Sequence, residues 1–373
     1  MSEAINLSGV DDSAPSELQS MIADSVERLF AEQVTPALLE RFDAGDSADA
    51  LWQMVVDNGL PGALVPEAAG GSGASWLDAS PVLRAIGYWQ APLALGETML
   101  ASLLLAQAGL EVPEGAISLI QAGRLGDLQL SADGRQLNGR AINVPWARSC
   151  RWAVVADAGR LALVDLRQPS IRLDAGSNFA GEERDSLEFS NASTLAAAPL
   201  QLADVAEPVW LLGALVRACS LVGALESSLD KAVQYANERV QFGKPIGKQQ
   251  ALQQYLAEMA GSIGAARMAT QVALRSAGEA FAAAPGSTSS LAFDVAVAKV
   301  CASEAASLAC SVVHQVFGAI GFTHEHTLHF ATRRLWSWRD EFGSDAQWAK
   351  VLGEAAIAAG SAGFWAGLTA RSL

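Results

Sequence analysis

The sequence contains 373 residues, of which 51% are hydrophobic and 17% are charged, and its mean hydropathy is +0.22. This composition excludes an intrinsically disordered chain, and at about 150 residues per domain the length predicts roughly two or three domains with a sizeable core. The 25 Lys and Arg residues are outnumbered by 40 Asp and Glu residues, which gives a net charge of -15. Such an acidic surface excludes nucleic acid and anionic membranes as general partners.

The cysteines are too few and too scattered for a disulfide framework, and no CxxC pair is present. They are Cys150, Cys219, Cys301 and Cys310. We expect reduced thiols in a cytoplasmic protein, because the N-terminus also lacks the basic and apolar regions of a secretory signal. The apolar span at about 351–371 carries Glu354 and is rich in Ala and Gly. We therefore expect a packed or interface helix there and no membrane span.

Residues 1–115 are predicted to form an all-helical N-terminal domain. After Ser16, a residue type that favours the start of a helix, the apolar side chains of 18–30 are spaced for one helix face. Further helical pattern runs over 77–110. A Gly- and Pro-rich loop over 59–76 precedes it and lacks the Lys-Ser/Thr of a phosphate-binding P-loop.

Residues 116–203 are predicted to form a small middle β-barrel or sandwich. Short runs of Val, Leu and Ile alternate with polar residues, and Asp-Gly and Asn-Gly pairs separate them, a pattern that predicts about six strands. The segment contains no histidine, and no catalytic grouping is visible in it.

Residues 204–373 are predicted to form a C-terminal helical domain of the four-helix-bundle type. One helix is expected to end at about Glu238, a second to start near Gln250, and a third to span 291–317. Long helices with short connections are typical of a bundle.

All histidines of the chain lie within a short stretch, at His314, His324, His326 and His329. The spacing of the last three, with Glu325 between them, is one that a metal could accept. The alternative is a loop-to-helix junction with hydrogen-bonded rings. Since no clear further ligand is present, we favour the junction and predict no metal.

The segment RVQFGKPIGKQQ, residues 239–250, concentrates positive charge in a chain that is otherwise poor in it. Arg239 is expected at a helix C-terminus, where a cation is favoured and a guanidinium can bind a phosphate with two hydrogen bonds. Gly243 and Gly247 permit a close backbone approach, and Pro245 fixes the turn. Two interpretations remain open, an anion site and an ordinary helix connection.

Three stretches carry a resemblance to a known family. YANERVQFGKPIGKQQALQQYLAEMA resembles the C-terminal motif of the acyl-CoA dehydrogenase family, and HQVFGAIGFTHEHTLH resembles its Q-x-x-G-G-x-G-[FY] turn. GLPGALVPEAAGGSGASWLD resembles its N-terminal domain loop. The resemblance implies an acyl-CoA dehydrogenase-like fold, in which a helical domain, a middle β domain and a C-terminal helical bundle follow one another.

The resemblance also implies an FAD cofactor held between two subunits. In the family, one subunit's β domain cradles the isoalloxazine ring, and a neighbour's C-terminal domain holds the ADP half. Carried over by position, Arg239 and Gln241 contact the pyrophosphate region, with Phe242 beside them. The residues near the adenosine are Gln249 and Gln250, and the turn at the adenine end is Gln315, Phe317 and Gly318.

The family reaction is the α,β-dehydrogenation of an acyl-CoA thioester, in which a glutamate removes the α proton and the flavin accepts a hydride. The family's two positions for this glutamate align with Phe342 and Gly213, and neither is acidic. Glu341 lies one residue early, which on a helix turns a side chain by about 100°. It is a candidate base or, alternatively, a surface carboxylate paired with Arg333, Arg334 or Arg339.

The middle segment also departs from the family pattern, because the expected T-E-P-x-x-G-S-D stretch is absent from about 115–135. Our hypothesis is that the chain resembles the degenerate subunit of heteromeric α2β2 acyl-CoA dehydrogenases that act on steroid side-chain CoA thioesters. A partner subunit then supplies the glutamate and the ring cradle, and an electron-transfer flavoprotein-type acceptor is expected. The alternatives are a self-sufficient homotetramer that uses Glu341 and a flavin-free scaffold or binding subunit.

Overall fold

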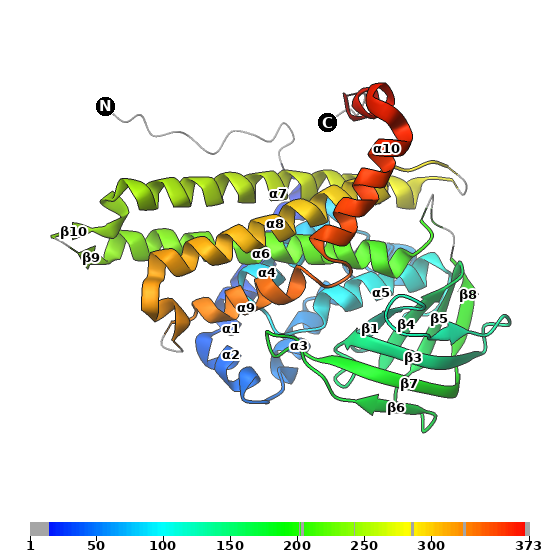
Figure 1. The fold of residues 1–373 in the computed structure, drawn as a ribbon. Coiled ribbons are helices and arrows are strands. Elements are labelled where there is room, and N and C mark those ends of the chain that lie inside the picture. The colour runs from blue at the N-terminus through cyan, green and yellow to red at the C-terminus, as the bar shows by residue number, and fades with distance from the viewer. Residues whose placement is uncertain are drawn as a thin grey trace.

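The structure, a computed structural model, describes residues 15–200, 202, 205–241, 243–284, 287–323 and 326–369. Along the chain, helices come first, a set of strands follows, and further helices complete the fold (Figure 1). The first elements are α1 (Glu17–Gln33), α2 (Pro36–Asp43), α3 (Asp49–Asp57), η1 (Leu60–Gly62), η2 (Glu67–Ala69), α4 (Trp76–Tyr88) and α5 (Leu95–Gln107). The middle strands are β1 (Ile117–Gln121), β2 (Gln129–Leu130), β3 (Gln136–Pro145), β4 (Trp152–Asp157), β5 (Arg160–Asp165), β6 (Ile171–Asp174), β7 (Arg184–Ser193) and β8 (Ala196–Pro199). The last elements are α6 (Pro208–Glu238), β9 (Val240–Gln241), β10 (Lys244–Pro245), η3 (Ile246–Lys248), α7 (Gln250–Ala282), α8 (Leu291–Phe317), η4 (Gly318–Phe322), α9 (Leu328–Trp338) and α10 (Asp345–Thr369).

The N-terminal helices begin where their capping residues predict. Ser16 caps α1, because its hydroxyl accepts a hydrogen bond from the backbone N–H of Gln19 at 2.9 Å. Ser75 and Asp78 form a reciprocal capping box at the start of α4. The single pattern predicted over 77–110 is two helices, α4 and α5. The chain turns between them, and Gln90 there adopts a φ of 57°.

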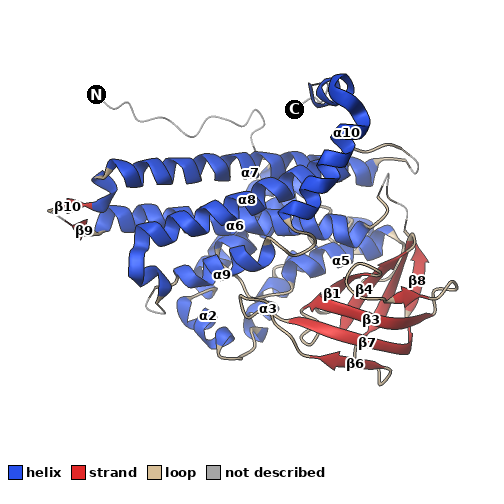
Figure 2. Cartoon of the chain, viewed as in Figure 1, coloured by secondary structure: helices blue, strands red, loops and turns tan. Residues whose placement is uncertain are grey.

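The middle strands form two four-stranded sheets in the orders β1-β4-β5-β8 and β2-β3-β7-β6 (Figure 2). Side chains from both sheets share one core, to which Val155 and Val164 contribute from the first sheet and Leu187 and Phe189 from the second. The sandwich has more strands than the six predicted, because β2 is too short to show an alternating pattern and β8 is mostly alanine.

The long helix α6 is the central element of the C-terminal part, and α4, α7, α8 and α9 pack around it. The predicted helix end at Glu238, the start at Gln250 and the span 291–317 agree with α6, α7 and α8. Within the described residues, α6, α8 and α10 are long and apolar enough to cross a membrane by length and composition. The chain itself buries 94% of the most apolar stretch of α6, 61% of that in α8 and 0% of that in α10. Core packing thus accounts for the apolar character of α6 and of most of α8, whereas the interface expected for α10 stays a prediction.

Helices α4 and α6 cross at such close range that glycine is required at the contact. A Cβ added at Gly223 would lie 1.9 Å from the carbonyl oxygen of Arg84, and one added at Gly87 would lie 1.8 Å from that of Ser220. We predict that Gly223→Ala lowers the free energy of unfolding by about 1–3 kcal/mol in urea denaturation, because the helices must move apart. Gly261→Ala on α7 is the control, since a Cβ there meets nothing within 4 Å. Equal effects of the two substitutions would contradict the close crossing.

Candidate functional site

A hairpin closes the C-terminal end of α6 and carries the predicted anion-binding residues. Strands β9 and β10 pair antiparallel, and Gly243 in the turn between them has a φ of 78°, which favours glycine. Arg239 joins α6 to the hairpin: its N–H donates to the carbonyl of Tyr235, and its carbonyl accepts from the N–H of Ile246, both at 2.9 Å. These backbone bonds fix the point from which the guanidinium projects.

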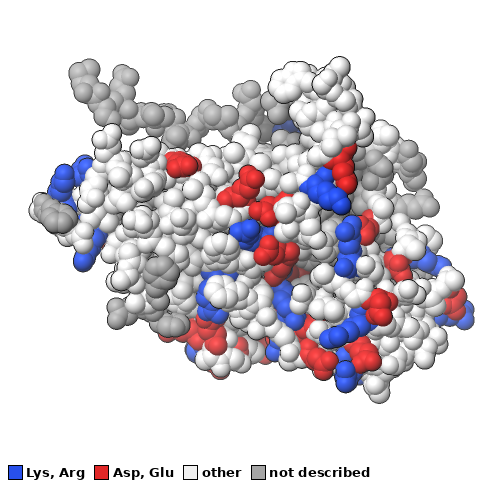
Figure 3. Space-filling model, viewed as in Figure 1, with Lys and Arg blue, Asp and Glu red and all other residues white. Residues whose placement is uncertain are grey.

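Most of the predicted cofactor residues at this end are open to solvent. Arg239, Gln241, Gln250 and Gln315 are exposed, and Gln249 is half-buried. In the described part of the chain, the Arg239 side chain has no hydrogen-bond or ion-pair partner. Figure 3 shows basic side chains gathered at this end of the molecule, over the hairpin. The arrangement therefore offers an accessible cation for an anionic ligand.

Phe317 and Gly318 of the predicted turn differ in their exposure to solvent. Gly318 is exposed with a φ of 61°, but Phe317 is only 4% exposed, and its ring stacks on Tyr235 with centroids 4.4 Å apart. The ring of Phe317 thus belongs to the protein core, and its predicted place in the turn can involve its backbone. Phe242 lies outside the described residues.

The histidines form a junction in the part of their stretch that is described. The ring of His326 accepts a hydrogen bond from the N–H of Leu328 at 3.1 Å, and His329 lies 2.8 Å from the carbonyl of His326. Among the described residues there is no group of three His, Cys, Asp or Glu side chains that could hold a metal. His324 and Glu325, which the metal hypothesis needs, lie outside them.

A second candidate site lies at the opposite end of α6, where the middle sandwich meets the C-terminal helices. A cavity of about 380 Å³ opens between β1, β3, the start of α6 and the loop from α9 to α10. Its apolar walls include Leu119, Ile142, Val144, Trp210 and Phe342. Its polar walls include Asn143, Asn178, Arg184 and Glu341.

Phe342 and Gly213, the positions that the resemblance assigns to a catalytic glutamate, meet at the edge of this cavity. The Phe342 ring packs so closely on Gly213 of α6 that a Cβ at Gly213 would lie 2.5 Å from it. Trp210 meets the same ring edge-on at 6.2 Å. An aromatic ring therefore fills the space where a carboxylate at either position would have to lie.

Glu341 lies beside Phe342 but does not pair with the arginines that the sequence suggested. Arg184 binds both of its oxygens, at 2.8 and 2.9 Å, and Arg217 binds one at 2.6 Å. Its side chain is 16% exposed. The expected surface pairing was wrong, because the loop turns this carboxylate inward. The expected partners bind other acids, namely Arg333 with Asp43, Arg334 with Glu182 and Arg339 with Asp345.

The environment of Glu341 strongly favours its ionised form. Burial alone would raise the pKa, but Arg184 and Arg217 outweigh it and lower the pKa of Glu341 to about 2. A carboxylate with so little affinity for a proton is a poor general base at neutral pH.

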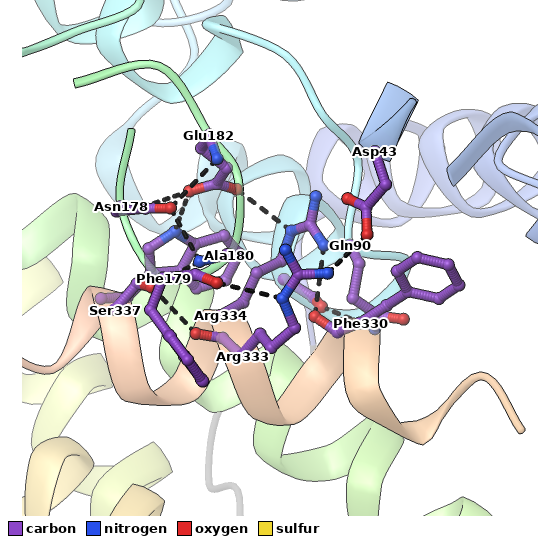
Figure 4. A network of polar contacts seen from close by, with 12 residues as sticks. Asp43, Gln90, Asn178, Phe179, Ala180, Glu182, Phe330, Arg333, Arg334 and Ser337 are labelled. Carbon is purple, nitrogen blue, oxygen red and sulfur yellow. Dashed lines mark hydrogen bonds and ion pairs between the residues drawn. The ribbon is translucent and has the colours of Figure 1, made fainter. Parts of the chain in front are cut away.

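Further buried charges continue from Glu341 into the middle and N-terminal parts. Glu182 binds Arg184 and Arg334, each at 3.1 Å, and Arg217 also pairs with Glu97 of α5. Figure 4 shows the loop from Asn178 to Glu182 resting on α9. The sequence showed no catalytic grouping in the middle segment, but this segment supplies part of the network of buried ion pairs.

Comparisons with known proteins show which family the chain matches. A model described as "Acyl-CoA dehydrogenase, N-terminal domain" matches residues 16–112, and one described as "Acyl-CoA dehydrogenase, C-terminal domain" matches 210–353. Acyl-CoA dehydrogenase IpdE2 of Mycobacterium tuberculosis is 30% identical over 325 residues, which are 86% of this chain and 91% of that protein. Acyl-CoA dehydrogenase FadE27 of the same organism is 29% identical over 337 residues, 84% of this chain and 88% of that one.

Solved structures show the same fold. A chain of the ChsE4-ChsE5 complex from Mycobacterium tuberculosis superposes with a TM-score of 0.81 at 23% identity, covering 92% of this chain and 98% of that one. Butyryl-CoA dehydrogenase from Megasphaera elsdenii gives a TM-score of 0.79 at 21% identity, covering 92% and 99%. The predicted fold class is confirmed: a helical N-terminal domain, a middle β domain and a helical C-terminal domain.

Proposed function

Because the chain belongs to the acyl-CoA dehydrogenase family, we propose that it is a subunit of an FAD-dependent acyl-CoA dehydrogenase, in which it supplies the ADP-binding half of a shared FAD site. A partner subunit supplies the other half of that site, with the ring cradle and the catalytic glutamate. Bound FAD would accept the hydride that leaves the β carbon of the acyl thioester.

The separation of the two candidate sites along α6 is the observation that carries this proposal. The helix has 31 residues and is therefore about 46 Å long at about 1.5 Å per residue. Trp210, in the cavity wall, lies in its first turn, and Arg239 follows its last residue. The phosphates lie near the middle of FAD, so its ring reaches over only part of this distance. A flavin whose phosphates lie at Arg239 would therefore keep its ring away from the cavity of the same chain, which supports a ring site on another chain.

The hairpin end fits the phosphate half of the cofactor. The exposed guanidinium of Arg239 has no partner among the described residues, so it can pair with a phosphate without first breaking an ion pair. Gly247 packs so closely on α6 that a Cβ there would lie 3.0 Å from the carbonyl of Ala236. This contact holds the connection near the end of α6, where Gln241, Gln249 and Gln250 remain accessible beside Arg239.

The cavity at the start of α6 does not fit the removal of the α proton of the acyl thioester. Phe342 and Gly213 leave both family positions without a carboxylate, and both oxygens of Glu341 are bound by arginine. This arrangement supports a catalytic glutamate in the partner over a self-sufficient homotetramer that uses Glu341. The unpaired Arg239 in turn supports a flavin-binding subunit over a flavin-free scaffold.

The relatives suggest the setting of the reaction. One similar fold is that of a chain in a ChsE4-ChsE5 complex, and another is that of a Tcur3481-Tcur3483 steroid acyl-CoA dehydrogenase variant, with a TM-score of 0.80. We therefore propose an α2β2 assembly with a related subunit and a steroid side-chain CoA thioester as substrate. A cytoplasmic location and an electron-transfer flavoprotein-type acceptor complete the proposal.

Substitution of Arg239 tests the shared cofactor site. Arg239→Ala, purified in complex with the partner, is expected to raise the dissociation constant of FAD roughly 10- to 100-fold, because a charge-assisted phosphate contact is lost. The measurement is the flavin retained after dialysis, read by absorbance. Arg275→Ala is the matched control, since Arg275 is an exposed arginine of α7 outside the hairpin. Flavin retention in Arg239→Ala equal to that in the control would refute the assignment.

A further inference from the structure

We infer that Glu341 is the central anchor of a buried interdomain lock, which holds the Phe342 ring over the family's base positions at the edge of the cavity. The lock consists of Glu97, Glu182, Arg184, Arg217, Arg334 and Glu341. The inference deepens the proposed function, on which it rests, because it states what has replaced the catalytic carboxylate in this subunit.

The lock is a chain of alternating charges. Arg217 lies between Glu97 and Glu341, and Arg184 lies between Glu341 and Glu182. Arg334 completes the chain at Glu182, with a separation of 3.1 Å. Positive and negative groups are equal in number, so the buried cluster carries no net charge. Such balance is needed because an unpaired ion is expensive to bury.

Five members of the lock are almost fully buried, and Glu341 is mostly buried. The side chains of Arg184 and Arg217 are each 4% exposed, and that of Arg334 is 1% exposed. Glu97 and Glu182 are 3% and 2% exposed, while Glu341 reaches 16% where it borders the cavity. At this burial, loss of one charge leaves its partners uncompensated, so the members act as a unit.

The lock joins the three parts of the chain. Glu97 belongs to α5 of the N-terminal helices, whereas Glu182 and Arg184 belong to the middle domain. The C-terminal helices contribute Arg217 from α6 and Arg334 from α9. Glu341 extends from the loop after α9, binds Arg184 of the middle domain directly, and is connected to Glu97 of the N-terminal helices through Arg217. Its carboxylate therefore lies at the centre of the pairs that join the three parts.

Hydrogen bonds saturate the Glu341 carboxylate. One oxygen accepts from Arg184 and Asn178, and the other accepts from Arg184 and Arg217. Four donors match the roughly four lone-pair sites of a carboxylate. To act as a base, Glu341 would have to break at least one of these bonds and carry a proton between two buried arginines.

The loop that carries Glu341 is itself held in an unfavourable conformation. Phe342 has a φ of 52°, which is uncommon for a residue other than glycine. Lys299 donates to the carbonyls of Arg339 and Gly343 at 2.6 and 2.8 Å, and Trp348 donates to that of Phe342 at 2.9 Å. Such strain persists only where the surroundings over-determine the backbone. The result is a rigid loop that presses the Phe342 ring onto α6.

The inference is tested by Glu341→Gln in the isolated chain and in the complex with the partner. The lock predicts a melting temperature lowered by about 5 °C or more, because two buried arginines each lose one of their two counter-charges. It also predicts that backbone amides of 338–343 exchange about 10-fold faster or more. Turnover of an acyl-CoA by the complex should change by no more than about twofold, since the base lies on the partner. Glu354→Gln is the control, because Glu354 makes an exposed pair with Lys350.

The opposite result would overturn the lock. If Glu341 is the catalytic base, Glu341→Gln should keep the melting temperature and the amide exchange of the wild type, and flavin reduction by substrate should be lost. Should the glutamine variant not fold, Glu341→Asp retains the charge. If the lock is present, this variant should have a partly loosened loop and normal turnover. If Glu341 is instead the catalytic base, its turnover should fall by about 100-fold or more. A wild-type complex without flavin would refute the proposed function, yet the melting and exchange data would still decide on the lock.

Discussion

Replacement of Arg217 by methionine is expected to lower the free energy of unfolding by about 3–5 kcal/mol, because it removes one partner from buried ion pairs. Arg217 is the cation that pairs with Glu97 and one of two that pair with Glu341. Methionine retains much of the side-chain volume, so the loss reports charge rather than a cavity. The measurement is equilibrium unfolding in urea, followed by circular dichroism.

A second substitution separates this effect from general damage. Adding Glu97→Gln to the Arg217→Met chain removes the carboxylate that was left without its cation, so a substantial part of the lost stability should return. Glu97→Gln alone should destabilise, because it leaves an excess positive charge in the lock. If the double variant loses the full sum of the two single effects, the two groups do not interact and the lock is refuted.

Lys299→Met is expected to lower the free energy of unfolding by about 2–4 kcal/mol, because it removes the donor of the Gly343 carbonyl and weakens the bonding of two neighbouring carbonyls. The Lys299 amine donates to the carbonyls of Trp338, Arg339 and Gly343, and it thereby connects α8 with the end of α9 and the loop that follows. The chief structural result should be a mobile 339–343 loop, seen as faster amide exchange. Lys350→Met is the control, since Lys350 is 76% exposed on α10.

The Lys299 substitution should also change how stability depends on pH. Burial lowers the pKa of Lys299 to about 7, below the value of 10.5 of an unperturbed lysine. Between these values the unfolded chain binds a proton that the folded chain has released, so this group makes stability rise with pH. The stability gap between wild type and Lys299→Met should therefore widen as the pH rises from about 7. A gap that is constant or shrinks over this range would contradict the shifted pKa.

The sequence predicts the helices of this protein better than its buried charges. Capping and apolar periodicity are local signals, and they locate the starts of α1 and α7 and the span of α8. Pairing of charges is not local: Glu341 meets Arg184 from far back in the sequence and Arg217 from α6. From the sequence, Glu341 is expected to pair with the arginines nearby, because a sequence gives only the separation of residues along the chain.

The proposed hairpin site likewise depends on a local signal in the sequence. Arg239, Gln241, Gln249 and Gln250 lie in one contiguous segment, so a short motif brings them together without any long-range contact. Phe317 shows the limit of the approach, because the motif gave its position but not its burial against Tyr235. The buried ion pairs of the lock had one signal in the sequence, an excess of Arg and Glu in 182–184 and 333–341. The same excess is equally typical of an exposed, charged surface.

The flavin content of the purified protein tests the shared FAD site most directly. The chain is purified alone and in complex with its partner subunit, and FAD is quantified by its absorbance after release by denaturation. A shared site predicts a colourless chain alone and one FAD per pair of chains in the complex, bleached when an acyl-CoA substrate is added. One FAD per chain in the chain alone, bleached by an acyl-CoA, would contradict the account and identify a complete enzyme.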